Sequence, residues 1–366
     1  MKILYIAPLP PPITGQSLVS KVLLDYLKQI DNVFIVNLSK DSLKEGIGGW
    51  KRVLQVFNIL LKVYKGKKNI DAIYLTISES LAGNMKDLLI YLICFNKLNK
   101  FHIHLHGGSI KKLLWDKHNF LYKINKYFIK RFAGVIVSGE SHLEIFNSII
   151  SENKIKIIPN FAQESLFISE SEFNDKFRTC DPIRLLYVGG LIEMKGYLEL
   201  AKGFSEIPPE IRKHFVLDIA GKFESESAKS NFFKLLDKTK GITYHGIINE
   251  QTKIKLFTSA HIFCLPTSFF EGQPISILEA YASGCLVLTT PQPGILDIFR
   301  NNINGYFISE RNITAVKHAL INVFNNITDI EGIANHNRLL ALSNYKLEKY
   351  VTSVRNSFET LINKYE

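Results

Sequence analysis

Short β-branched runs alternate with longer amphipathic segments along the whole chain of 366 residues. Helical spacing of apolar residues lies between these runs, for example over 17–29, 86–98, 196–207 and 249–259. The regular alternation of strand and helix predicts parallel sheets with right-handed crossovers, and hence an α/β fold of the doubly wound kind. The expected strands are KILYIAP, NVFIVNL, AIYLTI, FHIHLH and GVIVSG in the first half, and IRLLYVGG, FVLDIAG, ITYHG, HIFCLP and CLVLTT in the second.

The length of the chain predicts two domains, because single hydrophobic cores stop growing at about 250–300 residues. The two series of strands fit this division. A polar, acidic segment, SESEFNDKFRTCD at residues 169–181, is interpreted as part of a linker. We therefore expect domains at 1–165 and 166–345, with the site in a cleft between them, since two doubly wound domains that face each other bind ligands there.

The sequence also indicates the cellular compartment in which the protein is expected. No apolar run approaches the roughly 20 residues of a membrane span, and the N-terminus MKILYIAPLP lacks the pattern of a secretory signal. The four cysteines show neither metal nor disulfide spacing. These features predict a cytoplasmic protein with reduced thiols.

The net charge of +11 is distributed unevenly. Residues 1–170 contain 23 basic and 13 acidic side chains, whereas the remainder contains 22 and 21. The asymmetry favours an anionic partner for the first half, although a lysine-rich composition of surface residues is an alternative. No nucleic-acid recognition motif accompanies the charge, so an anionic membrane surface is expected and nucleic acid is not.

Three loops that follow expected strands carry candidate site residues. Gly15 precedes a helix and permits close approach of a ligand, although such a loop can also be a simple turn. His106 is the last of three alternating histidines before two glycines, and it is expected to enter the cleft. The alternatives are that the three histidines form a metal cluster or that they make structural hydrogen bonds only. Lys195 lies just before a helix that opens at Gly196, where its charge can meet a phosphate or simply be solvated.

The segment LPTSFFEGQPISILEAYASGCLVLTT places carboxylates on both sides of a helix start. The helix is expected from Pro274 to Ala282, with Glu271 in the preceding loop and Glu279 in its second turn. This is not the opposed carboxylate pair of a glycosidase. Carboxylates flanking free helix N–H groups suit a ligand with hydroxyls at both ends and negative charge in the middle, as in a sugar nucleotide.

At this point the chain resembles glycosyltransferase family four, the retaining transferases of the GT-B fold with two Rossmann-like domains. SFFEGQPISILEAYASGCLVLTT is similar to the Glu-x7-Glu signature of that family, and VGGLIEMKG resembles its Gly-Arg-Leu…Lys-Gly loop. The segments HLHGG and PPPITGQS of the first half fit as well. The resemblance covers most of the chain and is strongest over 184–307.

The resemblance implies roles for individual residues. Glu271 would contact donor sugar hydroxyls, Glu279 the ribose, and Lys195 the diphosphate, while His106 would reach the reacting sugar. Gly15 would let the first loop close on the diphosphate, and the base would lie near Tyr244 to Ile247. The donor-binding set implied in this way comprises Gly15, Gly190, Tyr244, Gly246, Gln273, Pro274, Ile275, Ser276 and Glu279, with Glu271, His106 and Lys195 as catalytic residues.

The chain departs from the family pattern at two positions. Gly190 stands where the family usually has a phosphate-binding arginine, and Thr14 precedes Gly15 where many members have a second glycine. The sequence shows no Asp-x-Asp metal motif after a strand, and the resemblance implies a metal-independent site without a cofactor. The resemblance further implies that the last helix, residues 346–366, returns to the first domain. Its apolar positions are Tyr350, Val351, Val354, Phe358, Leu361 and Ile362.

Residues 48–68 and 109–132 mix lysine and arginine with aromatic and leucine residues at helical spacing. Such basic amphipathic helices favour an anionic membrane interface, unless their apolar stripes pack on the sheet. We therefore expect a peripheral enzyme at the cytoplasmic face of the inner membrane of a bacterium. Its predicted activity is hexosyl transfer from a UDP- or GDP-linked sugar to a lipid-linked saccharide of lipopolysaccharide O-antigen, capsule or exopolysaccharide. A sugar-nucleotide epimerase of the same architecture and a non-catalytic partner subunit are the alternatives.

Overall fold

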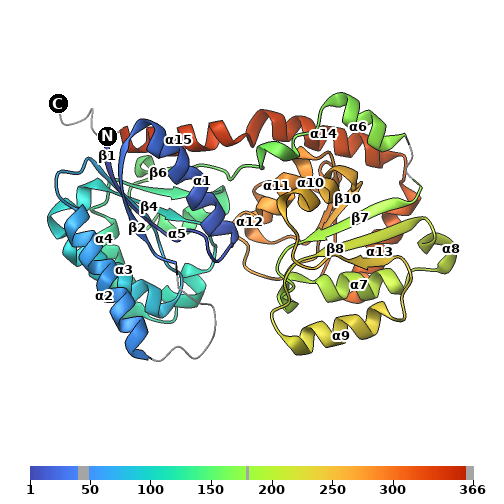
Figure 1. Cartoon of the computed structure of the whole chain (residues 1–366), viewed down its shortest axis with the longest axis horizontal. Coiled ribbons are helices and arrows are strands. Elements are labelled where there is room, and N and C mark those ends of the chain that lie inside the picture. Colours follow the sequence, from blue (N-terminus) through green and yellow to red (C-terminus); the bar gives the residue numbers. More distant parts are fainter. Residues whose placement is uncertain (40–48, 179–180, 360–366) are drawn as a thin grey trace. The chain divides into compact units, whose positions relative to one another are not determined.

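The computed structural model describes residues 1–39, 49–178 and 181–359. The chain divides into two compact units (Figure 1). The first unit is Met1–Asn160 together with the segment that begins at Glu348, and the second is Phe161–Leu347. Each unit contains one parallel sheet, which has six strands among the described residues. The predicted α/β fold with two doubly wound sheets is confirmed.

The first sheet has the strand order β2-β1-β3-β4-β5-β6. The chain order reverses between β1 and β3, which is the point where doubly wound sheets bind ligands. Every residue of β3, β4 and β5 is buried, and this explains why these strands read as continuous apolar runs rather than as alternating ones. The strands are β1 Lys2–Ala7, β2 Asn32–Asn37, β3 Ala72–Thr76, β4 Phe101–Leu105, β5 Gly134–Val137 and β6 Ile155–Ile157. The α-helices connecting them are α1 Gly15–Ile30, α2 Gly49–Gly66, α3 Leu81–Ile93, α4 Asn119–Ile129 and α5 Leu143–Phe146.

The second sheet has the order β12-β11-β10-β7-β8-β9, so its reversal lies between β7 and β10. Its strands are β7 Ile183–Val188, β8 Phe215–Ala220, β9 Ile242–Tyr244, β10 Ile262–Leu265, β11 Leu286–Thr289 and β12 Gly305–Phe307. Its α-helices are α6 Glu170–Phe177, α7 Tyr197–Ser205, α8 Pro209–Arg212, α9 Glu226–Leu236, α10 Glu250–Ser259, α11 Ile275–Ala282, α12 Pro293–Leu296, α13 Ile313–Asn325 and α14 Asp329–Asn344.

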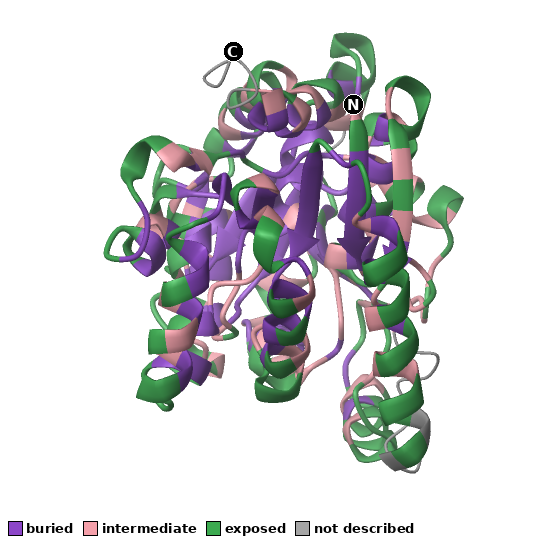
Figure 2. Cartoon of the chain, turned by 90° about the vertical axis from the view of Figure 1, so that its left-hand side faces the viewer, coloured by how far each residue is buried: buried purple, intermediate pink, exposed green. Residues whose placement is uncertain are grey.

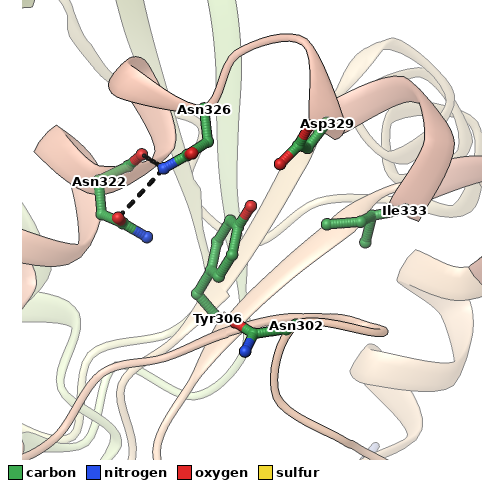
Figure 3. A pocket seen from close by; sticks show the side chains of 6 residues that line it. All are labelled: Asn302, Tyr306, Asn322, Asn326, Asp329 and Ile333. Atoms are coloured by element: carbon green, nitrogen blue, oxygen red, sulfur yellow. Dashed lines mark hydrogen bonds between the residues drawn. The ribbon is translucent and has the colours of Figure 1, made fainter.

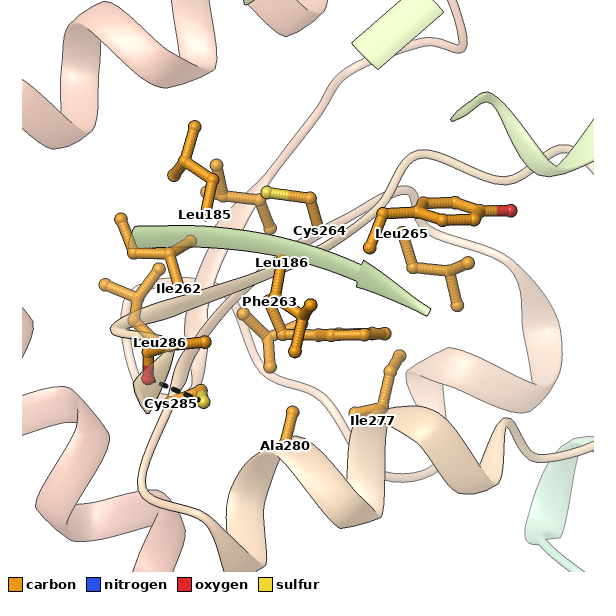
Figure 4. Packing of buried hydrophobic residues seen from close by; sticks show 14 of the residues in the cluster. Leu185, Leu186, Ile262, Phe263, Cys264, Leu265, Ile277, Ala280, Cys285 and Leu286 are labelled. Atoms are coloured by element: carbon orange, nitrogen blue, oxygen red, sulfur yellow. Dashed lines mark hydrogen bonds between the residues drawn. The ribbon is translucent and has the colours of Figure 1, made fainter. Parts of the chain in front are cut away.

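Helix α11 is fixed against the middle of this sheet. Its residues Ile277 and Ala280 are fully buried and belong to the same core cluster as Phe263 of β10 (Figure 4). Six of the eight residues of α11 are buried, so the helix is apolar nearly all round and its position is set by packing rather than by solvent. The start of α11 is thereby held at the carboxyl end of β10.

The linker interpretation of residues 169–181 is wrong for most of that segment. Residues 170–177 form α6, which begins with a capping box in which Ser169 and Glu172 satisfy each other's backbone N–H groups. Phe173 is buried in a cluster with Ile168 and Ala334, and its ring fills the space beside Gly284. Phe177 packs against the same cluster, so two phenylalanines in a polar segment anchor the helix, which composition alone did not reveal. Residues 179 and 180 lie outside the described part.

The short strands β6 and β12 were not expected. Each has three residues with mixed burial and lies at the edge of its sheet, so neither shows a periodic pattern of its own. No helix of the described residues is long and apolar enough to cross a membrane.

Helix α15, Leu347–Glu359, packs with the first unit. Four of its expected apolar positions, Tyr350, Val351, Val354 and Phe358, are buried, and the ring of Phe358 contacts those of Tyr74 and His102. Leu361 and Ile362 lie outside the described residues.

A buried charge cluster fastens the same helix. Arg355 Nε donates to Asp31 at 2.9 Å, and the amino group of Met1 donates to the same carboxylate at 2.7 Å. Burial opposes ionisation of Asp31, but the hydrogen bonds from Arg355 and the N-terminus hold its pKa below the usual value.

Phe358→Ala should destabilise the first unit by ~3–5 kcal/mol, because it leaves a cavity beside two aromatic rings of the sheet. Chemical denaturation monitored by circular dichroism measures the change. Glu348→Ala, at the exposed start of the same helix, is the control and should change stability by less than about 0.5 kcal/mol. Equal stability of the Phe358 variant and the wild type would show that α15 contributes no packing energy.

Candidate active site

The loops after β7 and β10 meet at the reversal point of the second sheet. Gly196 has a φ of 75°, and a Cβ there would lie 2.0 Å from the carbonyl oxygen of Pro266. No other residue type allows this approach. The backbone N–H of Ser268 also donates to the carbonyl of Met194 at 2.8 Å. The loop that carries Lys195 is therefore fastened to the loop that carries Glu271.

Lys195 and Glu271 form an ion pair with a distance of 3.1 Å between Nζ and Oε1. The ammonium also lies 5.3 Å from the centre of the Phe269 ring, and the Thr267 hydroxyl is 3.4 Å from the same carboxylate oxygen. A Cβ on Gly294 would lie 1.5 Å from the carbonyl oxygen of Gly272, so α12 closes tightly over this loop. Two residues that are 76 positions apart in the sequence are thus brought together at one point.

The start of α11 lies between the two signature glutamates. Pro274 is the N-cap residue, with Ile275 and Ser276 in the first turn, and the first turn contains no acidic residue. Gln273 is buried just before it. The helix therefore offers an uncompensated positive dipole end where the predicted diphosphate would lie.

Glu279 is buried and forms an ion pair with Lys253 of α10 at 2.6 Å. Desolvation raises the pKa of the Glu279 carboxyl, and the charge of Lys253 opposes that rise. Lys253 Nζ also donates to Gln163 Oε1 at 3.2 Å. The sequence analysis missed Lys253, because nothing in its helical surroundings distinguishes it from a solvated lysine; only the fold brings it to Glu279.

Two further predicted donor residues, Tyr244 and Gly246, lie at the end of β9, next to the end of β8. The Tyr244 hydroxyl donates to the carbonyl of Gly221 at 2.9 Å, and the N–H of Gly221 donates to the carbonyl of Gly246 at 2.8 Å. Gly246 has a φ of 71°, which favours glycine. The two strand ends are thereby tied together, and Tyr244 is oriented by its hydroxyl.

Gly190 has open space beside it. A Cβ there would meet only the Ile192 side chain, at 3.4 Å, so packing does not require a glycine. The N–H of Leu191 donates to the carbonyl of Lys222 at 2.9 Å, which places the exposed Lys222 next to the Gly190 loop. Lys222 is thus a second cation at the carboxyl ends of β7 and β8, and the sequence analysis did not single it out.

The other two predicted residues belong to the first unit. Gly15 is the first residue of α1, after a capping box formed by Thr14 and Ser17. His106 follows β4, and its ring stacks on that of His104 with centroids 3.9 Å apart. Burial lowers the pKa of His106 to about 4, so its imidazole is neutral at neutral pH. The role of both residues at the donor stays a prediction.

The other two histidines of β4 have structural surroundings. His104 Nδ1 is 2.8 Å from the Tyr74 hydroxyl, and His102 is buried against Phe358. Across the described ranges, no group of three or more histidine, cysteine, aspartate or glutamate side chains is arranged to hold a metal ion.

Two cavities lie elsewhere in the second unit. One of about 440 Å³ is a polar hollow beside β12, lined by Asn302, Tyr306, Asn322, Asn326, Asp329 and Ile333 (Figure 3). Another of about 590 Å³ includes Pro182, Arg184 and His261, and so lies at the amino end of β7. None of the predicted donor residues lines either cavity.

Comparison with known proteins gives one family match. Residues 169–336 match the family described as glycosyl transferases group 1. The chain is 22% identical over 325 residues to the uncharacterized glycosyltransferase MJ1069 of Methanocaldococcus jannaschii, covering 85% of this chain and 81% of that protein. It is also 22% identical over 273 residues to the capsular polysaccharide biosynthesis glycosyltransferase CapM of Staphylococcus aureus, covering 72% and 70%.

Among solved structures, Anabaena HepE in complex with UDP-glucose superposes with a TM-score of 0.74 at 15% identity, covering 99% of this chain and 100% of that one. Similarity at this level of identity concerns the fold alone. The chain therefore has the GT-B fold, and the part of it that matches the glycosyl transferases group 1 model, residues 169–336, lies within its second unit.

Proposed function

We propose that this protein is a retaining, metal-independent glycosyltransferase that moves a hexose from a UDP- or GDP-linked sugar to a lipid-linked saccharide. The observation that carries the proposal is the arrangement around α11. Glu271 and Glu279 flank a helix start with no acidic residue in its first turn, and each is paired with a lysine. The capsule-related CapM and the UDP-glucose complex of HepE are similar proteins that support a nucleotide-sugar donor and a polysaccharide product.

Each part of the donor has a matching group in the second unit. The diphosphate would meet the start of α11 and Lys195, whose charge is held 3.1 Å from Glu271 before any ligand arrives. Sugar hydroxyls would donate to Glu271, and ribose hydroxyls to Glu279. Departure of a nucleoside diphosphate develops negative charge, and preorganised cations and N–H groups lower the barrier because they need no reorganisation.

We assign the place of the missing arginine at Gly190 to Lys222 within this proposal. Lys195 forms an ion pair with Glu271. Lys222 is exposed and forms no ion pair with any residue in the described part of the chain. An exposed lysine can reach a phosphate as a mobile point charge. Its reach would compensate for the side chain that Gly190 lacks.

The alternatives differ in what they release. An epimerase of the same architecture would release a free product without an acceptor. A non-catalytic subunit would bind nucleotide without turnover, but both signature carboxylates are retained and electrostatically paired, which favours catalysis.

Incubating the purified protein with UDP- and GDP-linked hexoses and a bacterial membrane lipid extract should transfer labelled sugar into the lipid fraction. Without the extract, only slow release of free sugar is expected, because water is a poor acceptor in such a site. Thin-layer chromatography of both phases separates the outcomes. Abundant free product without lipid would favour the epimerase, and nucleotide binding without turnover would favour the non-catalytic subunit.

Lys195→Ala should lower the transfer rate by roughly a hundredfold, because it removes a charge from the leaving group. It should weaken binding of UDP but not of uridine, as measured by calorimetry. Glu279→Gln is the matched comparison and should weaken uridine and UDP equally, since both contain the ribose. Lys255→Ala, an exposed lysine of α10, is the control and should behave as the wild type. Normal turnover of the Lys195 variant would assign the leaving-group charge to another cation.

We further propose that the first unit binds the cytoplasmic face of an anionic membrane, where a lipid-linked acceptor resides. In α4, part of the expected apolar stripe, including Leu121 and Phe128, packs on the sheet, while the lysines remain largely exposed.

In α2, by contrast, most of the apolar stripe is exposed. The exposed fractions are 82% for Trp50, 60% for Val53, 59% for Leu54, 55% for Phe57, 41% for Leu61 and 57% for Tyr64. Figure 2 shows exposed outer helix surfaces around the buried strands. Helix α2 contains no acidic residue, so both its charge and its apolar face suit an anionic interface.

Replacing five lysines of this unit with glutamine should reduce co-sedimentation with phosphatidylglycerol vesicles more than with phosphatidylcholine vesicles. Each lysine contributes about 1 kcal/mol at such a surface, and salt should weaken the interaction. Equal binding at low salt would refute the electrostatic part of the proposal. The five are Lys111, Lys112, Lys123, Lys126 and Lys130; a control with the same loss of charge replaces Lys202, Lys234, Lys238, Lys240 and Lys255 of the second unit.

A further inference from the structure

The reversal point of the first sheet carries a carboxylate that no part of the donor site uses. Glu79 lies three residues beyond the end of β3, and β3 is one of the two strands between which the order of this sheet reverses. Ligands of doubly wound sheets bind at this position. The second sheet has Lys195 and Glu271 at the equivalent place, so Glu79 is the acidic group that the first unit offers there.

One oxygen of the Glu79 carboxylate accepts hydrogen bonds, and the other has no hydrogen-bond partner among the described residues. Oε2 accepts hydrogen bonds from the backbone N–H of Ser109, at 3.3 Å, and from the Ser109 hydroxyl. Oε1 is buried and has no hydrogen-bond partner among the residues that the structure describes. A buried acceptor without a partner is costly, so such an atom in a native structure calls for a ligand or a water molecule.

The loop after β4 is built around this carboxylate. A Cβ on Gly107 would lie 2.4 Å from Oε1 and 2.6 Å from Oε2, so a larger residue there would displace the carboxylate from its present position. The Glu79 carboxylate thus packs against Gly107, with one oxygen hydrogen-bonded to Ser109.

The residues around Glu79 favour a ligand group that is an uncharged hydrogen-bond donor. No lysine or arginine is paired with Glu79 in the described ranges, and the neighbouring residue His106 is uncharged because burial lowers its pKa to about 4. Nε2 of His106 is a second buried atom without a hydrogen-bond partner among the described residues. An uncompensated carboxylate repels phosphate but accepts strongly from a hydroxyl group.

We propose that Glu79 binds a hydroxyl group of the acceptor saccharide through its free Oε1, with Ser109 and Gly107 holding the carboxylate in place. The proposal rests on the transferase function proposed above. The first unit would then recognise the acceptor by a charge-assisted hydrogen bond, while the signature glutamates of the second unit serve the donor.

Glu79→Gln tests this role, because the amide keeps the shape of the side chain and removes its charge. Transfer of labelled sugar into the membrane lipid extract should fall about tenfold or more, as expected when a charged hydrogen bond to substrate is lost. Binding of UDP and slow hydrolysis of the sugar nucleotide without lipid should stay within about twofold of wild type, since neither needs the acceptor. Glu140→Gln, an exposed carboxylate that follows β5 in the same unit, is the matched control and should transfer as the wild type.

The outcomes separate this inference from the function on which it depends. If the wild type transfers sugar and Glu79→Gln transfers equally well, the acceptor role of Glu79 is overturned while the transferase remains. Equal losses of transfer, hydrolysis and UDP binding would also overturn it, since they indicate a general defect. No transfer by the wild type with any sugar nucleotide would remove both proposals. Should Glu79→Gln melt well below the wild type, Ser109→Ala is measured instead; it loosens the same carboxylate and must show the same split between transfer and hydrolysis.

Discussion

The close backbone contact between the loops after β7 and β10 is the constraint on which the candidate site depends. It exists because Gly196 adopts a left-handed conformation against the carbonyl of Pro266. A second close contact, between Gly294 of α12 and the carbonyl of Gly272, covers the loop before α11. A side chain at position 196 would force these two loops apart, and one at position 294 would push α12 away from the loop before α11. Lys195 and Glu271 would then lose their 3.1 Å contact, and the loop before α11 would lose its cover.

Charge pairing is the second organising feature, and it involves three carboxylates that are largely withdrawn from solvent. Glu279 is neutralised by Lys253, Glu271 by Lys195, and Asp31 by Arg355 together with the N-terminal amino group. Each pair reduces the cost of keeping a charge out of water and fixes its orientation. Glu79 differs, because it receives hydrogen bonds from Ser109 alone and keeps one oxygen without a partner among the described residues. This difference is the basis of the acceptor role that we propose for it.

The sequence predicted the parts of the fold whose local pattern and tertiary surroundings agree. Ten strands were expected from β-branched runs, and the long buried ones such as β1, β3 and β7 coincide with those runs within one or two residues. The failures occurred where the local pattern was weak. Strands β6 and β12 have three residues each and are stabilised by a single neighbouring strand. Helix α6 looked like a linker because its only buried residue is Phe173.

The sequence by itself determined the α/β alternation, the glycines at the loops, and the Glu-x7-Glu segment that points to a sugar nucleotide. These are local properties, since strand propensity, helix capping and left-handed glycine conformations depend on neighbouring residues. Only the tertiary structure decided which charges meet. The pairing of Glu279 with Lys253, of Lys195 with Glu271, and the seating of Glu79 beside Gly107 join residues that are 26, 76 and 28 positions apart. No local pattern records such distances, because the order of strands in a sheet is set by how the whole core packs.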